Sequence, residues 1–383
     1  MTEDKRIKWK TGIILVCSAF LSLVLTRSII KDIGSLGLFT PVEKKVDFKM
    51  TDIYNAVEEN RAEIPLSQDV IIVSVDECNR NETLDVIRQI ASYAPKAIGL
   101  DVYFAVPQEN NNYLLETVLL TENLVSAMQI ATQDGGKTFE RVPLSFYDED
   151  YPPEHAGFVN LDVIHTWNVI RTFRPYVCTS AGDTLPSMPM ALAEIAYPEQ
   201  AAKVFSKGNT KEIIDYTGCE IEVLTAHQLN DDGIAERIKG KVVLIGLMND
   251  VKDIYLTPLR NPLAGIMIHA HALQTIISDS FIRNCPAWIN KTFAVLLSIL
   301  FLYLLQVTKN HRNYFGSLIV RISQFVILYL LLWCGCWIFA KWHIYVDFAP
   351  AILMLGLSSL ARDLIASTYG IITNIVISHR NKQ

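Results

Sequence analysis

Acidic side chains follow two predicted strands of the chain at the points where those strands end. Asp76 and Glu77 follow the β-branched apolar run 70–75, and Asp101 ends the apolar run 97–100. A stretch with apolar residues at helical spacing joins the two strands, so we expect them to be adjacent and parallel. Open α/β sheets bind ligands outside this edge, where clustered carboxylates can hold a cation or a basic ligand. The alternative is structural, with the acids capping helices or accepting hydrogen bonds from loop amides.

Basic and loop residues complete the set of candidates. Arg171 and Arg174 flank a predicted strand and can pair with the acidic strand ends or with an anionic ligand, or form a structural salt bridge. Asp253 and Thr257 fall in a loop after the predicted strand 242–245, where turn chemistry also explains them. The residues predicted to bind a ligand are Asp76, Glu77, Asp101, Arg171, Asp253, Thr257 and His269.

Two histidines on the predicted helix 269–278 raise the question of a metal site. His269 and His271 are two positions apart, so they point to different faces of a helix and cannot easily share one ion. We therefore predict histidines packed beneath the sheet, with no metal and no cofactor. The sequence also lacks Gly-x-Ser-x-Gly, His-Glu-x-x-His and a phosphate-binding loop, so an enzyme is not expected.

The elements that must position these residues follow an α/β pattern. In addition to the two strands above, the hydrophobic pattern predicts strands and helices at 124–130, 242–245, 83–93, 111–120, 188–196 and 269–278. The segments 157–161 and 169–173 are predicted as a hairpin-like pair around the loop 162–167. The sequence thus predicts an α/β domain with a mostly parallel sheet flanked by helices.

Four apolar stretches are predicted to be transmembrane helices, because a bilayer core about 30 Å thick needs about 20 apolar helical residues. They lie at 11–30, 286–307, 316–340 and 346–366. The first has a basic segment before it, as a signal peptide does. No small-x-small cleavage site follows it, so an uncleaved signal anchor is the prediction.

The distribution of basic residues orients these helices. Lys5, Arg6, Lys8 and Lys10 precede the first one, so the positive-inside rule places residues 1–10 in the cytoplasm. Four spans then place the tail 367–383 in the cytoplasm too, and residues 31–285 outside. The predicted location is a bacterial inner membrane, with the lipid bilayer as a partner.

Charge is segregated between the two parts of the chain. Residues 32–285 contain 20 Lys and Arg against 36 Asp and Glu, a net charge of −16. Repulsion from phosphates excludes this part as a general nucleic-acid binder. In the same part, Cys78, Cys178, Cys219 and Cys285 would face an oxidising space, but their spacing specifies no disulfide framework.

Several segments, in a fixed order, carry a resemblance to a known family. They are 46–50, 73–77, 97–104, 157–161 followed by 169–171, 186–193 and, as the most specific part, 240–275. Together they resemble the CHASE sensor domains of the second type. The resemblance implies an extracytoplasmic module, usually fused to cyclases, histidine kinases or other signalling domains, that senses or transmits.

The chain also departs from the pattern of this family. After Asp76 and Glu77 it lacks the family's Ser-Leu and Trp-Pro segments, which puts any role of that loop in doubt. About twenty residues follow Ala361, too few for a cytoplasmic output domain. We therefore expect a sensor or receptor subunit that signals through a partner in trans and that can form homo-oligomers. The alternative is a membrane scaffold subunit without a small ligand.

Overall fold

The computed structural model describes residues 3–33, 49–60, 64–109, 111–132, 136–161, 168–310 and 314–380. The predicted loop 162–167 and most of the segment 46–50 lie outside this description. The chain divides into two compact units, Asn55–Ile282 and a second unit formed by Met1–Tyr54 with Arg283–Gln383. We describe each unit by itself.

A mostly parallel sheet forms the centre of the unit Asn55–Ile282. Its strands are, in spatial order, β10 (Glu220–Thr225), β1 (Leu66–Ser74), β11 (Val242–Gly246), β2 (Ala97–Asp101), β3 (Leu124–Ala131) and β4 (Glu140–Val142), and β5 (Ala156–Phe158) also pairs with β3. Only β4 runs antiparallel to its neighbour. The α/β fold with a mostly parallel sheet is therefore confirmed.

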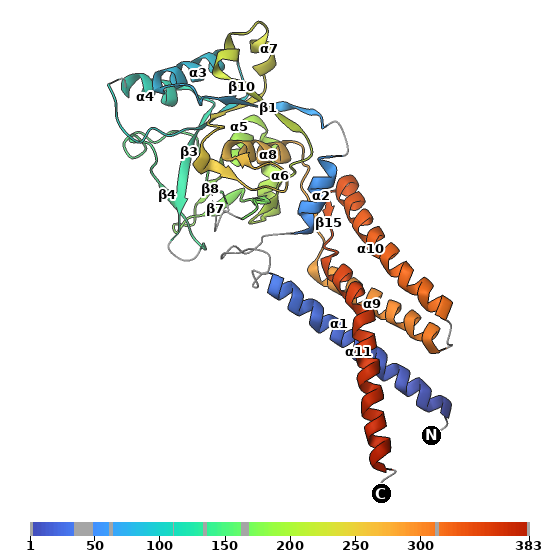
Figure 1. The fold of residues 1–383 in the computed structure, drawn as a ribbon. Coiled ribbons are helices and arrows are strands. Elements are labelled where there is room, and N and C mark those ends of the chain that lie inside the picture. The colour runs from blue at the N-terminus through green and yellow to red at the C-terminus, as the bar shows by residue number, and fades with distance from the viewer. Residues whose placement is uncertain are drawn as a thin grey trace. The chain divides into compact units, whose positions relative to one another are not determined.

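Helices cover both faces of this sheet, as a parallel sheet requires. Ile71 and Val73 of β1 pack with α3 (Arg80–Ser92) and α4 (Asn111–Leu120), whereas Val70 and Ile72 face the opposite layer. That layer contains α5 (Met188–Ala196), α6 (Pro198–Lys207) and α8 (Gly265–Ile277). The two helical layers lie on either side of the sheet in Figure 1. All four of these β1 side chains are fully buried.

The strands that end at Asp101 and before Asp76 are not adjacent, so this part of the prediction is wrong. β11 lies between them and pairs in parallel with both, and Ser74, Gly246 and Asp101 stand in one row across the three strands. Because β11 comes about 170 residues after β1, no local pattern shows this insertion. A Cβ on Gly246 would lie 3.2 Å from the Cβ of Asp101, so the row is closely packed.

The predicted hairpin of 157–161 with 169–173 is also wrong. β5 pairs in parallel with β3, and β6 (Thr172–Phe173) pairs antiparallel with β9 (Glu212–Ile213). β5 lies so close to the start of α5 that a Cβ on Gly157 would lie 2.5 Å from the Cα of Met188. Glycine at this position therefore allows the helix to approach the strand.

Helix α8 does not continue directly into the next apolar helix. It ends at Ile277, and Asp279 has a φ of 49°, a left-handed conformation that interrupts the helix. The next helix begins at Ala287. The segment between them contains the short strand β14 (Arg283–Asn284), which pairs in parallel with β15 (Ile344–Tyr345).

The other unit contains four long helices. They are α1 (Glu3–Ile33), α9 (Ala287–Asn310), α10 (Tyr314–Trp342) and α11 (Ala349–Arg380) (Figure 1). Among the described residues, three stretches are long and apolar enough to cross a membrane: Ala287–Thr308, Leu318–Trp342 and Ala349–Ile377. In α1 the apolar stretch is the shorter Thr11–Arg27. The structure therefore supports three of the four predicted spans, and the first stays a prediction.

Aromatic side chains of this unit pack around Tyr54. Tyr54, in α2 (Met50–Glu58), packs its ring against Phe339 and Tyr345, and its hydroxyl donates a 2.9 Å hydrogen bond to the carbonyl oxygen of Val346. A side chain on Gly335 would overlap the ring of Tyr54. The segment after α10 is thus held by contacts with α2.

Both histidines of α8 are buried, as predicted. The ring of His271 lies 5.3 Å from the ring of Tyr216, and its Nδ1 has no hydrogen-bond partner among the described residues. Burial lowers the pKa of His269 and of His271 to about 4. Both rings are therefore neutral at pH 7.

We expect the domain to lose stability as the pH falls from 7 to 5, since unfolded histidines with a pKa of about 6.5 take up protons that the folded protein does not. His271→Leu removes one of the two groups. It should make this loss smaller by about 2 kcal/mol at pH 5 and leave stability at pH 7.5 unchanged or higher. Pulse proteolysis of the full chain in urea at both pH values measures the free energy of unfolding.

The matched control is His227→Leu, because the side chain of His227 is 83% exposed. The raised pKa of Asp101, about 6, acts in the opposite direction but is common to all three proteins. An identical pH dependence in His271→Leu and the wild type would contradict the expectation.

Candidate functional site

The carboxylate of Asp76 binds the loop that follows β11. It accepts hydrogen bonds from the backbone N–H of Met248 at 3.0 Å and of Asn249 at 3.1 Å, and from the hydroxyl of Ser74 at 2.6 Å. The cap of α3 is a different residue, Asn79. Asp76 therefore ties the end of β1 to the loop after β11. This agrees with the structural alternative, in which the strand-end acids accept hydrogen bonds from loop amides.

Asp101 and Asp253 come together near the start of α8. The carboxylate of Asp253 accepts hydrogen bonds from the Gly265 N–H and the Tyr255 hydroxyl. Burial, and then the charge of Asp101, raise the pKa of Asp253, and burial raises that of Asp101 to about 6. A carboxylate at a helix N-terminus is favourable, so Asp253 fixes where α8 begins.

His269 lies close enough to Asp253 to feel its charge, one helical turn after the start of α8. The charge of Asp253 partly opposes the lowering of the pKa of His269 by burial. The ring of His269 also hydrogen-bonds the backbone of Val159. The structure thus brings together Asp101, Asp253 and His269 from the predicted set. Among the described residues, no group of three potential ligands is arranged to hold a metal ion.

The other predicted residues have separate environments. The side chain of Glu77 is 80% exposed, with an oxygen 3.6 Å from Nε2 of His227. Thr257 is buried, and its hydroxyl accepts the N–H of Leu259 at 3.3 Å, which is turn chemistry. Arg171 is buried and donates to the carbonyl oxygen of Val169 at 3.4 Å.

A cavity of about 200 Å³ lies elsewhere in the same unit, next to β3, β5, β6, α5 and α8. Its walls combine aromatic and aliphatic side chains with a few polar groups. The lining residues are Ile130, Thr132, Phe139, Phe158, Asn160, Leu161, Thr172, Phe173, Arg174, Ser187, Pro189, Ile268, His269 and Ala272. Of the predicted site residues, His269 is the one that reaches it. Sequence patterns contain little sign of this cavity, because its residues come from five segments that share no motif.

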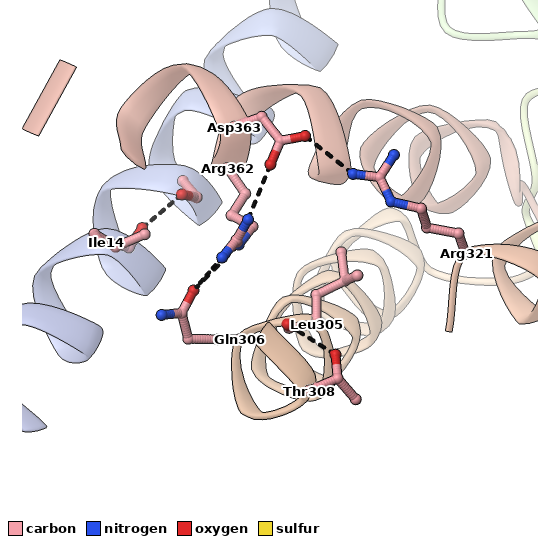
Figure 2. Close-up of polar contacts among 8 residues, drawn as sticks. Ile14, Leu305, Gln306, Thr308, Arg321, Arg362 and Asp363 are labelled. Carbon is pink, nitrogen blue, oxygen red and sulfur yellow. Dashed lines mark hydrogen bonds and ion pairs between the residues drawn. The ribbon is translucent and has the colours of Figure 1, made fainter. Parts of the chain in front are cut away.

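A chain of polar contacts joins the three long apolar helices of the other unit (Figure 2). Arg362 of α11 donates to Oε1 of Gln306 of α9 from Nε at 3.1 Å and Nη2 at 2.9 Å. Its Nη1 lies 2.9 Å from Oδ1 of Asp363, and Oδ2 of Asp363 is 3.1 Å from Nη2 of Arg321 of α10. We call these four residues the Arg362 network.

The side chain of Arg362 is buried among the helices. Asp363 lies inside the apolar stretch Ala349–Ile377, and α11 runs well past the predicted end of this span at 366. Further bonds between helices join Ser298 to Ser358 at 2.7 Å and Gln324 to the carbonyl oxygen of Leu355 at 2.7 Å. Interhelical polar bonds of this kind stabilise helix packing in lipid.

An α/β domain with a small cavity, on a chain with helices fit to cross a bilayer, defines a membrane-anchored protein with a separate folded domain. The sequence model of the CHASE2 domain matches residues 28–308, and the chain belongs to this family of CHASE-type extracytoplasmic sensory domains. The predicted resemblance is thereby confirmed. No curated protein and no solved structure matches the chain.

We expect Asp76→Ala to lower the free energy of unfolding by about 1–3 kcal/mol, because it leaves the loop amides of Met248 and Asn249 without an acceptor. The adjacent Glu77→Ala is the matched control and should change it by less than about 0.5 kcal/mol. Pulse proteolysis of the full chain measures both. Equal effects of the two substitutions would contradict the structural role of Asp76.

Proposed function

We propose that the protein is a membrane-bound sensory subunit. Its CHASE2 domain detects an extracytoplasmic ligand or protein, and its membrane helices pass the resulting change to a partner in trans. The observation that carries the proposal is the Arg362 network, which connects three helices within their apolar stretches. An enzymatic activity, a cofactor and nucleic-acid binding are not part of the proposal.

Charged groups inside membrane helices support a functional role for this network. Gln306 and Arg321 lie near the ends of the apolar stretches Ala287–Thr308 and Leu318–Trp342, whereas Arg362 and Asp363 lie well inside Ala349–Ile377. A charge costs about 2.5–3.5 kcal/mol at the centre of a membrane helix on insertion scales, and ionisable residues within such helices usually mark functional positions. Here the cost is offset by pairing, since Arg362 contacts both Gln306 and Asp363. The network therefore holds the three helices together, and we infer that it also carries the change between them.

The hydrogen bonds of the Arg362 network depend on direction, which suits a group of helices that switches between two arrangements. The guanidinium of Arg362 has five N–H donors, and Asp363 lies between it and the second guanidinium, that of Arg321. A small shift of α11 along its neighbours would exchange one set of bonds for another, at little cost. A ligand shifts such an equilibrium only by the difference in its affinity for the two states.

The orientation in the membrane is part of the same proposal. The basic residues of the N-terminal segment place it in the cytoplasm by the positive-inside rule, and the acidic domain then lies outside a bacterial inner membrane. The basic segments match the anionic lipid of the inner leaflet. A scaffold role without a small ligand is the competing function, and the experiment below separates the two.

The test uses the full chain in lipid nanodiscs and hydrogen exchange read by mass spectrometry. A panel of small carboxylates, amines and neutral compounds is added in turn. We expect at least one compound to slow exchange in residues 64–282 and to change it in α9, α10 or α11. Protection confined to the domain, or no protection by any compound, would overturn the sensory proposal and favour the scaffold.

Arg362→Leu and Gln306→Leu test whether the network carries the change. Each should retain protection of the domain by the active compound and reduce the change in the membrane helices at least severalfold. Thr368→Val is the matched control on α11, because the hydroxyl of Thr368 is exposed and bonds only within its own helix, to Leu364. Wild-type coupling in Arg362→Leu would exclude the network as the transmitting element.

A further inference from the structure

We propose that the cavity beside α5 and α8 binds a compact apolar molecule that offers one oxygen acceptor to the hydroxyl of Ser187. The inference rests on the proposed sensory function, because it names the chemical class of ligand that the domain detects. Two observations carry it. They are the volume and walls of the cavity, and a buried hydroxyl without a partner among the described residues on one of those walls.

The volume and the walls of the cavity define the apolar body of the ligand. A cavity of about 150 Å³ lined by apolar side chains holds benzene, and this one measures about 200 Å³. Phe139, Phe158 and Phe173 provide aromatic walls, and Ile130 and Ile268 add aliphatic surface. Burial of a ring or a short branched chain against these side chains is favourable, because apolar area of both partners leaves water. The space fits one such group with a single small polar atom.

The hydroxyl of Ser187 marks the polar end of the ligand. The side chain is 3% exposed and lines the cavity, and its Oγ has no hydrogen-bond partner among the described residues. A buried hydroxyl of this kind has lost its hydrogen bonds to water and gained none in return, which is costly. An oxygen acceptor on the ligand would restore one of these bonds.

The backbone at Ser187 is arranged for a bond that the side chain does not make. Ser187 is the N-cap residue of α5, with a φ of −71° and a ψ of 162°, but it makes no side-chain capping bond. A serine at this position usually accepts a hydrogen bond from an N–H of the first helical turn, which stabilises the helix. Departures of this kind from a local preference are expected at functional positions.

Contacts of its backbone hold Ser187 in the cavity wall. Its N–H donates to the carbonyl oxygen of Pro175 at 2.9 Å, and its own carbonyl oxygen accepts the N–H of Ala191 at 2.8 Å. Ser187 also forms an isolated parallel bridge with Phe158, next to the point where Gly157 allows the close approach of α5. Ser187 is thus fixed beside another residue of the wall. A group held in this way loses little freedom when a ligand binds.

Three other polar side chains of the wall are already engaged. The amide of Asn160 bonds both backbone groups of Ile130. The ring of His269 is neutral at pH 7 and hydrogen-bonds the backbone of Val159. Arg174 has a further partner of its own, so its guanidinium does not define the charge of the ligand. The polar contact is therefore inferred from the hydroxyl of Ser187 alone.

Two probes of matched shape separate the polar contact from the apolar one: acetophenone, which has a carbonyl oxygen, and α-methylstyrene, which has a methylene group in its place. Methyl NMR of the full chain in nanodiscs, with labelled isoleucine methyl groups, follows binding through Ile130 and Ile268. We expect both probes to shift these two signals and to leave those of Ile87 and Ile90, in the helical layer on the opposite face of the sheet, in place. No shift of Ile130 or Ile268 by acetophenone at the limit of its solubility would overturn the proposal.

Ser187→Ala tests the hydrogen bond. It should weaken acetophenone binding about fivefold, as the loss of one neutral hydrogen bond implies, and leave α-methylstyrene binding unchanged. Because the lipid takes up each probe equally with either protein, partitioning cancels when the variant is compared with the wild type. The matched control is Ser126→Ala, since Ser126 is also 3% exposed and lacks a partner among the described residues, but lies outside the cavity wall. Equal effects of the two substitutions on acetophenone binding would overturn the site.

Ala272→Leu tests the volume. Ala272 lies on α8 and lines the cavity, so a larger side chain at this position occupies the space of the probe. Neither probe should then shift Ile130 or Ile268. Wild-type positions of the Ile87 and Ile90 signals show that the variant is folded. Binding of either probe with wild-type affinity in the folded variant would contradict the proposed site.

The outcomes separate this inference from the proposed function. If acetophenone binds with the expected dependence on Ser187 and no compound changes exchange in α9, α10 or α11, the site stands and the sensory function fails. If acetophenone does not bind, but a compound of another class protects the domain and changes the membrane helices, the site fails and the sensory function stands.

Discussion

The fold depends on the insertion of β11 between β1 and β2. The strand is buried along its whole length and pairs in parallel with both neighbours. Without it, the backbone groups of β1 and β2 that face each other would have no hydrogen-bond partners at the centre of the sheet. Parallel strands gain stability only when helices cover both faces, and the last of these helices, α8, follows β11 in the chain. The start of α8 is therefore positioned by the same strand. The loop between them is tied back to β1 by the carboxylate of Asp76.

This construction gives two of the carboxylates at the acidic edge of the sheet a structural role. The carboxyl ends of parallel strands often leave a crevice open for a ligand. Here the chain's own loop takes the hydrogen bonds of Asp76, and the start of α8 takes those of Asp253. Both carboxylates are thereby committed to the fold. The open space lies instead beside β3 and β5, where the sheet is covered by the start of α5 and by α8.

Local sequence patterns predicted the elements better than their arrangement. The β-branched run 70–75 became β1, which begins four residues earlier, at Leu66, and the apolar run 242–245 became β11 with nearly the predicted bounds. Their pairing was not predictable, since a parallel contact between segments about 170 residues apart leaves no periodic signal. The pairing of 157–161 with 169–173 was predicted wrongly because strands this short can pair with several partners. The cavity was missed because Phe139, Phe158 and Phe173 have the sequence appearance of ordinary core residues.

The break after α8 limits how a change in the domain can reach the membrane helices. A continuous helix would transmit rotation as a rigid rod, but the left-handed residue Asp279 interrupts the helix before α9 begins. The segment between the two helices contains β14 (Arg283–Asn284), which pairs in parallel with β15 (Ile344–Tyr345). Both ends of α8 are held by contacts within the domain, since Asp253 accepts the N–H of Gly265 at its start and Thr275 accepts the N–H of Asp215 at 3.0 Å near its end. Under the proposed function, a displacement of α8 therefore has to pass through the segment after Ser278 and cannot pass along a continuous helix.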